Sequence, residues 1–441
     1  MAPLTVIFGG NSAGKSSLGH LLLALKQTAL STDRKRALNL GDASTLIDLG
    51  TFVDCLHGHD LSRKLKFEFG WTLQKQLEVR DALHPATRYT GDNLSLQATI
   101  SAEPRTEQPR TEQLRYVLSK DGETRLAVDV TSTRSGFNLE AHPLPLVRSQ
   151  GRAWPIEEPE KFYRLSETSL ARFQNAGFLT VFALETERVL RGLAFLGPLR
   201  EAPRRMYQWS GDTPEDVGQM GQFAVPALLA AESEGRRLNM LAKQRTQSFS
   251  EFIAGQLQRL GVIHSFAVKP VAAGRKDYEV LLKTGRDGAE VKITDVGVGV
   301  SQVLPAVVQA FYCSPYSTVW MEQPEIHLHP QVQAELADVF ISAIHARENG
   351  TERKIQLVIE SHSEHFLNRL QRRIAEEELR AEEVAIYFAS RQSDETRLEP
   401  LRLTEYGDIE NWPANFFGDD MADLTGRTVA AARRRRRSAE A

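Results

Sequence analysis

The sequence contains only two cysteines, Cys55 and Cys313, in 441 residues. Two cysteines cannot build a disulfide scaffold, and no Cys/His spacing of a zinc site is present. No apolar stretch approaches the roughly 20 residues that span a bilayer. The apolar start, Met1 to Phe8, has no basic segment of the kind that opens a signal peptide. These absences exclude secreted disulfide scaffolds and membrane-spanning proteins, and they predict a soluble protein of the cytoplasm.

The sequence also lacks an excess of either charge. It carries 54 Lys and Arg against 57 Asp and Glu, and 54 minus 57 gives a formal net charge of −3. Any nucleic-acid contact must therefore come from a local basic patch. Arg200, Arg204 and Arg205 could face phosphate or pair with Glu201 and its neighbours. The run Arg433 to Arg437 could grip nucleic acid, but it is more typical of a solvated tail.

What the chain does contain is a strand, a glycine-rich loop and a helix at its start. Leu4 to Phe8 is apolar and β-branched, which predicts a buried parallel strand, and Ser16 to Lys26 has leucines at helical spacing. After about residue 280 the alternation returns, with strands expected at 318–321, 355–359 and 384–388 and a helix at 330–345. This pattern predicts an α/β fold whose parallel core sheet is assembled from both ends of the chain.

Between these ends the pattern changes. Short alternating segments at about 63–140 predict an antiparallel β insert. Long helical patterns at 161–196 and 226–260 predict a helical middle. We therefore expect an N-terminal lobe at 1–200 that includes the insert, a helical middle segment at 201–285, a C-terminal lobe at 286–390, a cap at 391–425 and a disordered Arg-rich tail at 426–441.

Residues 9–16 read Gly-Gly-Asn-Ser-Ala-Gly-Lys-Ser and fit the pattern G-x-x-x-x-G-K-[ST]. In this pattern the backbone N–H groups and the following helix N-terminus face a phosphate. Lys15 would reach the β- and γ-phosphates, and Ser16 would place its hydroxyl on Mg²⁺. The strand before the loop and the helix after it argue against a chance glycine-rich turn. The expected nucleotide-binding residues are Gly9, Gly10, Asn11, Ser12, Ala13, Gly14, Lys15, Ser16 and Ser17.

A second motif, Glu-Gln-Pro-Glu-Ile-His-Leu-His-Pro at 322–330, follows the strand expected at 318–321. A hydrophobic strand that ends in a carboxylate is how P-loop enzymes hold Mg²⁺ opposite the phosphate loop. The expected metal ligands are therefore Ser16 and Glu322. The alternative is a separate metal site, because Glu322 and Glu325 are crowded together with His327 and His329.

Two further segments complete the pattern, a glycine-rich stretch at Thr294 to Gln302 and a histidine, His362, just past the strand at 355–359. In this order the segments resemble the ATP-binding cassette (ABC) ATPases of the structural-maintenance (SMC) and RecF-like branch. More narrowly, the sequence is similar to a group of prokaryotic AAA-type ATPases with the E-Q-P-E-x-H-L-H-P motif. The resemblance includes Gly197-Pro-Leu-Arg-Glu201 and the segment from Tyr406 to Phe417.

This resemblance covers nearly the whole chain and implies an ABC-type ATPase head that uses ATP and Mg²⁺. It implies that Gly299, Ser301 and Gln302 belong to a signature loop, which grips the γ-phosphate of ATP bound to a partner subunit. It also implies that His327 to Pro330 lie at the D-loop and that His362 is the switch histidine. A head-to-head homodimer with two ATP molecules between P-loop and signature loop follows from the resemblance.

The sequence departs from this family in three places. The phosphate loop begins at Gly9, where such ATPases first have an antiparallel strand pair, so the adenine-contacting surface is expected to be missing or to lie upstream of Met1. Gln323 stands at the position of the catalytic glutamate, and glutamine orients a water without accepting its proton. Hydrolysis is then slow, or it relies on Glu325 or Glu360. No Toprim-type nuclease segment of the overcoming-lysogenisation-defect nucleases follows, so any effector is expected to be another chain.

We therefore expect an ATP hydrolase with Glu322, Gln323, Glu325 and His362 as its catalytic group. The expected function is a dimeric ATPase that couples nucleotide state to DNA or to a partner effector, in bacterial defence or DNA maintenance. The alternative is an ATP-gated scaffold or sensor that hydrolyses ATP very slowly and holds or releases a separate effector protein. A transporter ATPase fits less well, because the large insert does not suit a membrane-coupling subunit.

Overall fold

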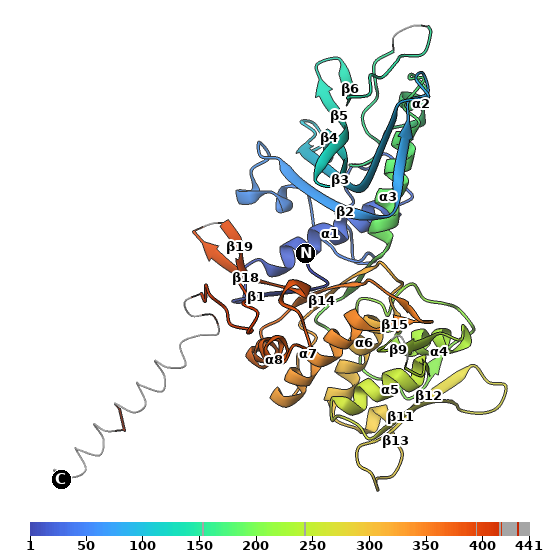
Figure 1. Ribbon diagram of the computed structural model, residues 1–441, viewed down its shortest axis with the longest axis vertical. Coiled ribbons are helices and arrows are strands. Elements are labelled where there is room, and N and C mark those ends of the chain that lie inside the picture. Colours follow the sequence, from blue (N-terminus) through green and yellow to red (C-terminus); the bar gives the residue numbers. More distant parts are fainter. Residues whose placement is uncertain (152–153, 242–243, 394, 414–415, 417–429, 432–441) are drawn as a thin grey trace. The chain divides into compact units, whose positions relative to one another are not determined.

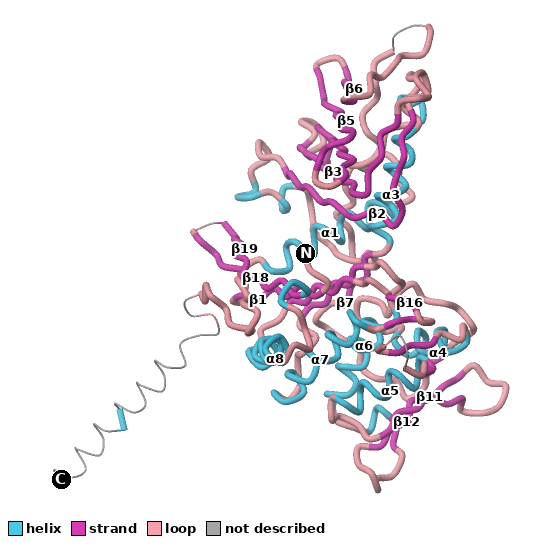
Figure 2. The backbone as a smooth tube through the Cα atoms, viewed as in Figure 1, coloured by secondary structure: helices cyan, strands magenta, loops and turns pink. Residues whose placement is uncertain are grey.

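The computed structural model describes residues 1–151, 154–241, 244–393, 395–413, 416 and 430–431. Phe417 and the run Arg433–Arg437, together with most of the tail expected at 426–441, lie outside the described residues. No helix in the described part of the chain is long and apolar enough to cross a membrane. The chain forms two compact units, one of Met1–Ser17 with Ala194–Ala441 and one of Leu18–Leu193. Figures 1 and 2 show their elements.

The first unit is built on a six-stranded sheet in the order β19-β18-β1-β17-β14-β7. Strand β1 pairs in parallel with both β17 and β18, and β14 pairs in parallel with β17, whereas β19 is antiparallel to β18. The predicted parallel core sheet, assembled from both ends of the chain, is therefore confirmed. Its strands are β1 (Leu4–Gly9), β7 (Leu193–Leu196), β14 (Thr318–Glu322), β17 (Gln356–Glu360), β18 (Val384–Gln392) and β19 (Glu395–Leu401).

Apolar side chains explain why these strands form the centre of the unit. All six residues of β1 are buried, and so are Val319, Trp320 and Met321 of β14. On one face of the sheet, Leu4, Val6 and Phe8 of β1 and Val319 and Met321 of β14 share one hydrophobic core with the helices that lie beside the sheet in Figure 1. These helices are α6 (Val298–Tyr312), α7 (Pro330–His345) and α8 (Glu364–Ala375). The bounds of α7 are those predicted, because Pro330 at the first helical position fixes where the helix begins.

The middle segment contains α4 (Ala224–Ser233) and α5 (Phe249–Arg259), and short strands interrupt its helices. The single helical pattern predicted at 226–260 is wrong, because Gly235 adopts a φ of 67° directly after α4 and ends it in the left-handed conformation. The remaining strands of this unit are β8 (Tyr207–Gln208), β9 (Arg237–Asn239), β10 (Gln247–Ser248), β11 (Ser265–Pro270), β12 (Asp277–Lys283), β13 (Val291–Lys292), β15 (Arg347–Glu348) and β16 (Thr351–Glu352).

The second unit contains a five-stranded antiparallel sheet in the order β2-β3-β4-β5-β6, which confirms the predicted β insert. The alternating burial along β4 places Leu114, Tyr116 and Leu118 in a core shared with α3. The pattern predicted as a long helix at 161–196 forms two helices and then strand β7. The elements are α1 (Lys15–Leu30), which begins in the first unit, β2 (Leu65–Arg80), β3 (Arg88–Ala102), β4 (Pro109–Lys120), β5 (Glu123–Thr133), β6 (Gly136–His142), α2 (Glu167–Leu170) and α3 (Phe178–Arg191).

Candidate functional site

The glycine-rich loop connects the end of β1 at Gly9 to the start of α1 at Lys15. Gly9 has a φ of 147° and Gly14 a φ of 83°, values that disfavour any residue with a side chain. A Cβ atom at Gly9 would collide with the backbone oxygen of Ala389, and one at Gly14 with the side chain of Thr396. The loop therefore needs both glycines, because strands β18 and β19 pack directly against it.

Lys15 reaches back across this loop. Its Nζ donates hydrogen bonds to the carbonyl oxygens of Gly9, at 3.1 Å, and Gly10, at 2.8 Å, and the residue is only 7% exposed. Burial lowers the pKa of Lys15, and the nearby carboxylates of Glu360, Glu322 and Glu325 oppose that shift. The ammonium group is thus held in a fixed position over the loop, where phosphate oxygens would meet it.

Two carboxylates end neighbouring strands beside Ser16. The register of β14 and β17 places Glu322 opposite Glu360. The Ser16 hydroxyl donates to Glu360 Oε2 at 2.7 Å, and Trp320 Nε1 donates to Glu360 Oε1 at 2.8 Å. Burial, and then the charge of Glu360, raise the pKa of Glu322 to about 7, against the opposing effects of Ser16, Arg200 and Lys15. Burial also raises the pKa of Glu360.

These residues fit Mg²⁺. Hard oxygen donors suit this ion, which takes one or two carboxylates and fills its other positions with water and substrate phosphate. Burial raises the pKa of both carboxyls, and a divalent cation bound between them would stabilise their charged forms. Ser16 and Glu322 were predicted as ligands from the sequence, and Glu360 joins them in the structure. Its position at the end of a predicted buried strand could have identified Glu360 as a further candidate ligand.

The alternative of a metal site that includes the histidines finds no support. His327 and His329 are exposed, and His329 caps α7 by accepting a hydrogen bond from the backbone N–H of Gln331 at 3.3 Å. Within the described ranges, no group of three or more His, Cys, Asp or Glu side chains is arranged to hold a metal ion. The position of His329 is explained by its role as the N-cap of α7, and no metal is needed to account for it.

A pocket of about 290 Å³ brings three of the predicted catalytic residues together, because Gln323, Glu325 and His362 all line it. Gln323 adopts a φ of 45°, and its backbone N–H donates to the carbonyl oxygen of Glu360 at 2.9 Å. The chain therefore turns sharply after Glu322. Glu322 is absent from this pocket's lining and lies on the side of Ser16 and Glu360 instead.

Glu325 is held rigidly, with one oxygen free. It is 5% exposed, and its Oε1 accepts hydrogen bonds from the Ser361 hydroxyl and the His362 backbone N–H, both at 2.8 Å. In the described part of the chain, its Oε2 has no hydrogen-bond partner. Burial raises the pKa of Glu325, and these hydrogen bonds and Arg200 oppose the shift. Glu325 thus lines a small pocket as a fixed carboxylate, and its buried Oε2 has no partner in the described part of the chain.

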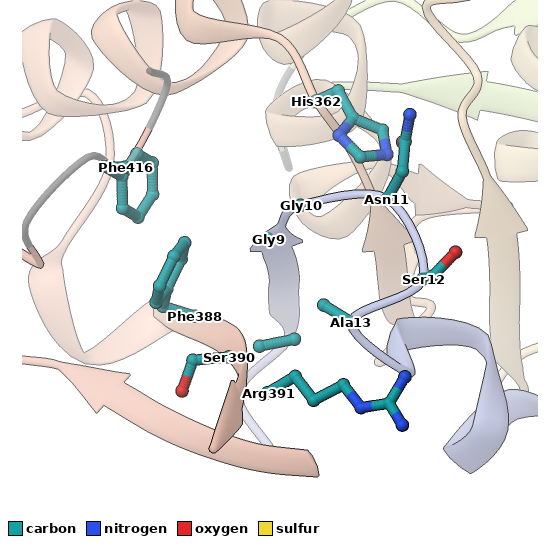
Figure 3. A pocket seen from close by; sticks show the side chains of 11 residues that line it. Gly9, Gly10, Asn11, Ser12, Ala13, His362, Phe388, Ser390, Arg391 and Phe416 are labelled. Carbon is teal, nitrogen blue, oxygen red and sulfur yellow. The ribbon is translucent and has the colours of Figure 1, made fainter. Parts of the chain in front are cut away.

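His362 lines this pocket and also the larger pocket beside the glycine-rich loop. Burial, and then the charge of Lys15, lower its pKa. The neutral imidazole therefore predominates at pH 7. Figure 3 shows its ring beside Asn11 of the loop.

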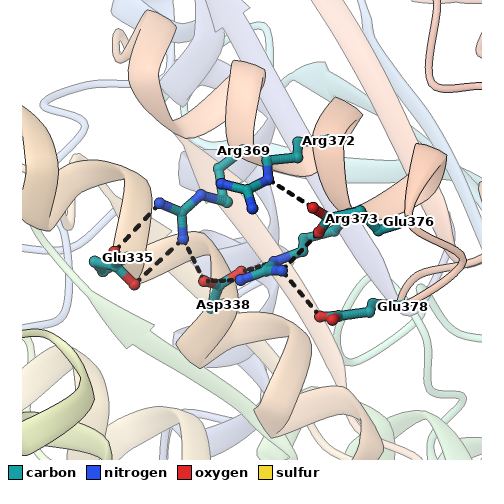
Figure 4. Close-up of polar contacts among 7 residues, drawn as sticks. All are labelled: Glu335, Asp338, Arg369, Arg372, Arg373, Glu376 and Glu378. Carbon is teal, nitrogen blue, oxygen red and sulfur yellow. Dashed lines mark hydrogen bonds and ion pairs between the residues drawn. The ribbon is translucent and has the colours of Figure 1, made fainter.

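An ion-pair network fixes the helices that follow these two site segments (Figure 4). Arg369 of α8 contacts both Glu335, at 3.2 Å, and Asp338 of α7. Arg373 binds Asp338 with two hydrogen bonds of 2.7 and 2.8 Å. Paired bonds of this kind fix orientation as well as distance. Because α7 follows the Glu325 turn and α8 follows His362, the network holds both ends of the pocket in place.

Arg200, which the sequence placed in a basic patch, faces the carboxylates instead. Its Nη2 lies 3.5 Å from the backbone oxygen of Glu322, and its Nε and Nη1 have no hydrogen-bond partner within the described residues. Burial lowers the pKa of Arg200 to about 10, against the charges of Glu322 and Glu325. Its role beside the site was missed, because only the position of β7 next to β14 reveals it.

The neighbouring arginines are paired with acidic side chains. Arg204 bonds to Glu201, as one of the two interpretations of this cluster predicted, and Arg205 lies 3.0 Å from Asp295. Arg200, Arg204 and Arg205 therefore do not form one patch of unpaired positive charge. The other candidate basic cluster, Arg433–Arg437, lies outside the described residues.

The residues predicted for the signature loop begin helix α6. Gly299, Ser301 and Gln302 lie in its first turns, and buried Ser301 lines a small pocket with Glu201 and Pro305. Of the described residues that line the pocket at the glycine-rich loop, none belongs to this group. The structure does not bring these residues to the chain's own phosphate loop, and their contact with a partner's nucleotide stays a prediction.

The larger pocket has a volume of about 660 Å³ (Figure 3). The loop from Gly9 to Ala13 lines one side, Phe388 and Phe416 line another, and Arg391 is also among the lining residues. Gly14, Lys15, Ser16 and Ser17 continue from the loop into α1, where the Ser17 N–H donates to the Gly14 carbonyl at 3.2 Å. The predicted nucleotide-binding loop therefore borders a cavity large enough for a small-molecule ligand.

Residues 237–367 match the family model of an AAA ATPase domain. The matched domain includes Glu322, Gln323, Glu325 and His362. A second family model, described as "Protein of unknown function (DUF3696)", matches residues 379–425, which include Phe388, Arg391 and Phe416. No curated protein matches the chain at a significant level.

Solved structures of SMC head domains are similar at low identity. An SmcHead bound to the C-winged helix domain of ScpA is 12% identical, with 92% of this chain and 91% of that chain covered and a TM-score of 0.37. The SMC head domain from Thermotoga maritima is 10% identical, with 90% of each chain covered and a TM-score of 0.36. The Smc head domain from Pyrococcus furiosus bound to the C-terminal domain of ScpA is 10% identical, with 91% and 90% covered and a TM-score of 0.37. These values are too low to support a functional assignment.

Proposed function

We propose that this protein is a P-loop ATPase that binds ATP with Mg²⁺ at Gly9–Ser17 and hydrolyses it. The observation that carries the proposal is the convergence of Lys15, Ser16, Glu322 and Glu360 at the ends of three adjacent parallel strands. The AAA ATPase domain match supports it independently. A cation, a hydroxyl and two carboxylates beside a glycine-rich loop are the groups that phosphoryl transfer needs.

Phosphate binding in this mechanism depends on backbone N–H groups and on the positive charge of Lys15. The loop N–H groups and the N-terminus of α1 face the phosphates, and the Lys15 ammonium exchanges its hydrogen bonds to Gly9 and Gly10 for phosphate oxygens. Ser16, Glu322 and Glu360 would hold Mg²⁺, which when bound neutralises charge on the β- and γ-phosphates. The Trp320 Nε1–H, which donates a hydrogen bond to Glu360, already orients this carboxylate.

The rest of the mechanism concerns the attacking water. Glu325 is the group we assign to accept its proton, because its carboxylate lines the pocket, is fixed by two hydrogen bonds and has a raised pKa. The Gln323 amide, on the same pocket, orients the water without accepting its proton. His362 reaches both pockets in its neutral form and can hydrogen-bond the γ-phosphate.

We further infer an ATP-dependent homodimer in which Gly299, Ser301 and Gln302 contact nucleotide bound to the partner subunit. Their absence from the described lining of the chain's own pocket is consistent with that role. The dimer would couple nucleotide state to DNA or to a separate effector protein, in bacterial defence or DNA maintenance. Gln323 favours a second candidate, an ATP-gated scaffold or sensor that turns over very slowly and releases an effector.

The experiment that tests the proposal compares wild type with Lys15→Ala, using calorimetry for ATP binding and phosphate release for turnover. Removal of the ammonium should abolish measurable ATP affinity while leaving the unfolding transition in place. Unchanged ATP binding by folded Lys15→Ala would refute the P-loop assignment. Measurable but very slow turnover in wild type, with tight ATP binding, would favour the scaffold.

A further inference from the structure

The pocket beside the glycine-rich loop has two chemically different walls (Figure 3). The loop wall presents backbone from Gly9 to Ala13, which suits phosphate. The opposite wall presents two aromatic rings, Phe388 of β18 and Phe416, whose centroids lie 4.9 Å apart with an interplanar angle of 28°. One pocket therefore offers a site for an anion and a site for a flat apolar group.

The aromatic wall is fixed in place. Phe416 is 7% exposed and packs against Phe8 at 5.5 Å and Trp412 at 5.1 Å between ring centroids. Phe8 and Phe388 are register partners on the adjacent strands β1 and β18. Phe388 is half-buried and so keeps part of its ring accessible.

The same strands set the separation between the two walls. Gly9 ends β1 and pairs with Ala389, whose backbone oxygen would collide with a Cβ at Gly9. Phe388 therefore sits at a defined position relative to the phosphate loop, and Phe416 packs against the Phe388 ring. Arg391, on the same strand, adds an exposed positive charge to the pocket.

We propose that Phe388 and Phe416 form the nucleobase subsite of the pocket, so that the segment matched by the DUF3696 family model supplies the base-binding wall. The inference rests on the proposed ATPase function. An aromatic ring stacks on a nucleobase because both present flat π-faces. The pocket, about 660 Å³, lies within the roughly 300–1,000 Å³ of small-molecule sites. Because every base has a π-face, the subsite favours nucleoside triphosphates over inorganic triphosphate and discriminates weakly between ATP and GTP.

The test is calorimetry with two probes, ATP and inorganic tripolyphosphate, each with Mg²⁺. Tripolyphosphate carries the phosphates but no base. Phe388→Leu keeps most of the side-chain volume and removes the π-face, so we expect ATP affinity to fall about tenfold, equivalent to about 1.4 kcal/mol, and tripolyphosphate affinity to stay unchanged. Tyr406→Leu is the matched control, since Tyr406 is 70% exposed and does not line the pocket.

A second variant distinguishes the loss of base stacking from a damaged fold. Phe388→Trp enlarges the π-face, and we expect it to retain or increase ATP affinity, which a damaged fold would not do. Unchanged ATP affinity in Phe388→Leu, or an equal loss for both probes, would overturn the nucleobase subsite and leave the ATPase assignment intact. Failure of wild type to bind either probe would instead refute the proposed function.

Discussion

Ser16 and Glu360 share a hydrogen bond of 2.7 Å although 344 positions separate them in the sequence. The bond exists because β17 pairs directly with β1, which places the end of one strand beside the first turn of the helix that follows the other. A cation that binds the Ser16 hydroxyl oxygen would therefore meet the Glu360 carboxylate as well. In the proposed mechanism Glu360 therefore belongs to the Mg²⁺ side of the site, whereas Glu325 lines the pocket of Gln323.

The first prediction separates these two carboxylates by their metal dependence. Glu360→Gln removes a charged oxygen next to Ser16, so we expect the Mg²⁺ concentration for half-maximal turnover to rise about 10- to 100-fold. Glu325→Gln should leave that concentration unchanged. The measurement is a Mg²⁺ titration of phosphate release at saturating ATP. Equal Mg²⁺ dependence in both variants would contradict the division.

The second prediction concerns the proton acceptor. Glu325→Gln should lower kcat by about 10²–10⁴-fold, the usual worth of general-base help, with ATP affinity retained. Gln323→Glu should change kcat by less than about tenfold, because Glu325 already serves the same pocket. Steady-state phosphate release gives both values. A large rate increase in Gln323→Glu, together with an unaffected Glu325→Gln, would move the base to position 323.

The third prediction concerns Arg200. Its Nε and Nη1 have no hydrogen-bond partner in the described part of the chain, and the charges of Glu322 and Glu325 act on its guanidinium group. Hydrogen bonds to charged groups contribute about 1.5–3 kcal/mol, so Arg200→Ala should lower kcat/KM about 10- to 100-fold. Arg200→Lys should recover only part of this, since lysine keeps the charge but not the planar fork.

The control for Arg200 is Arg204→Ala, which removes an exposed arginine that bonds to Glu201. This variant should keep the wild-type rate. If Arg200→Ala and Arg204→Ala behave alike, Arg200 has no role beyond the surface charge of this turn.

The local elements of this fold could be predicted from the sequence, and the neighbours of each strand could not. Strand β1 and helix α7 have strong local signals, an apolar β-branched run and Pro330 at a helix start. The short strand β9 pairs with β15, more than a hundred residues away, and no local periodicity marks such a strand. The long helix predicted there failed because apolar spacing alone does not reveal the break at Gly235.

The residues of the candidate site likewise fall into two groups, those that local sequence predicts and those that depend on which strands are neighbours. The phosphate loop and the Glu322 motif are contiguous in sequence, so their chemistry could be predicted from spacing. Glu360 as a metal-side group, Arg200 and the Phe388–Phe416 wall depend on which strands are adjacent, namely β17, β7 and β18. The expectation that the adenine-contacting surface is missing or lies upstream of Met1 was based on the segment before the loop, and the base-binding wall proposed above comes from the C-terminal segment instead.

The fourth prediction is a pH dependence of stability. Because the pKa of Glu322 rises from 4.5 to about 7 on folding, the folded state binds the proton more tightly than the unfolded state. The free energy of unfolding therefore falls as pH rises from 4.5 to about 7, by up to about 3 kcal/mol from this group. Glu322→Gln removes this contribution. Without nucleotide or metal, the variant should be more stable than wild type at pH 8 and nearly equal at pH 4.5.

Urea unfolding of both proteins at the two pH values measures this difference. The comparison uses the difference between wild type and variant, because groups that do not interact with Glu322 titrate equally in both. Added Mg²⁺ should raise the stability of wild type at pH 8 and leave Glu322→Gln less affected. A variant that is less stable than wild type at pH 8 would contradict the raised pKa.

The fifth prediction concerns ATP-dependent dimerisation, and the burial of the side chains in α6 decides which residue to change. Ser301 is buried, so a large residue there would disturb α6. Gln302 is half-buried in the same turn and can accept a change.

If this turn contacts nucleotide on a partner subunit, Gln302→Arg should weaken ATP-dependent dimerisation and leave ATP binding to the monomer unchanged. Light scattering with and without ATP and Mg²⁺, in the Glu325→Gln background to preserve bound ATP, measures the mass. Gln74→Arg, at an exposed position of β2, is the matched control and should dimerise as wild type does. Equal mass for all proteins with and without ATP would rule out the ATP-bridged dimer, because a site completed by two subunits must bring them together when nucleotide binds.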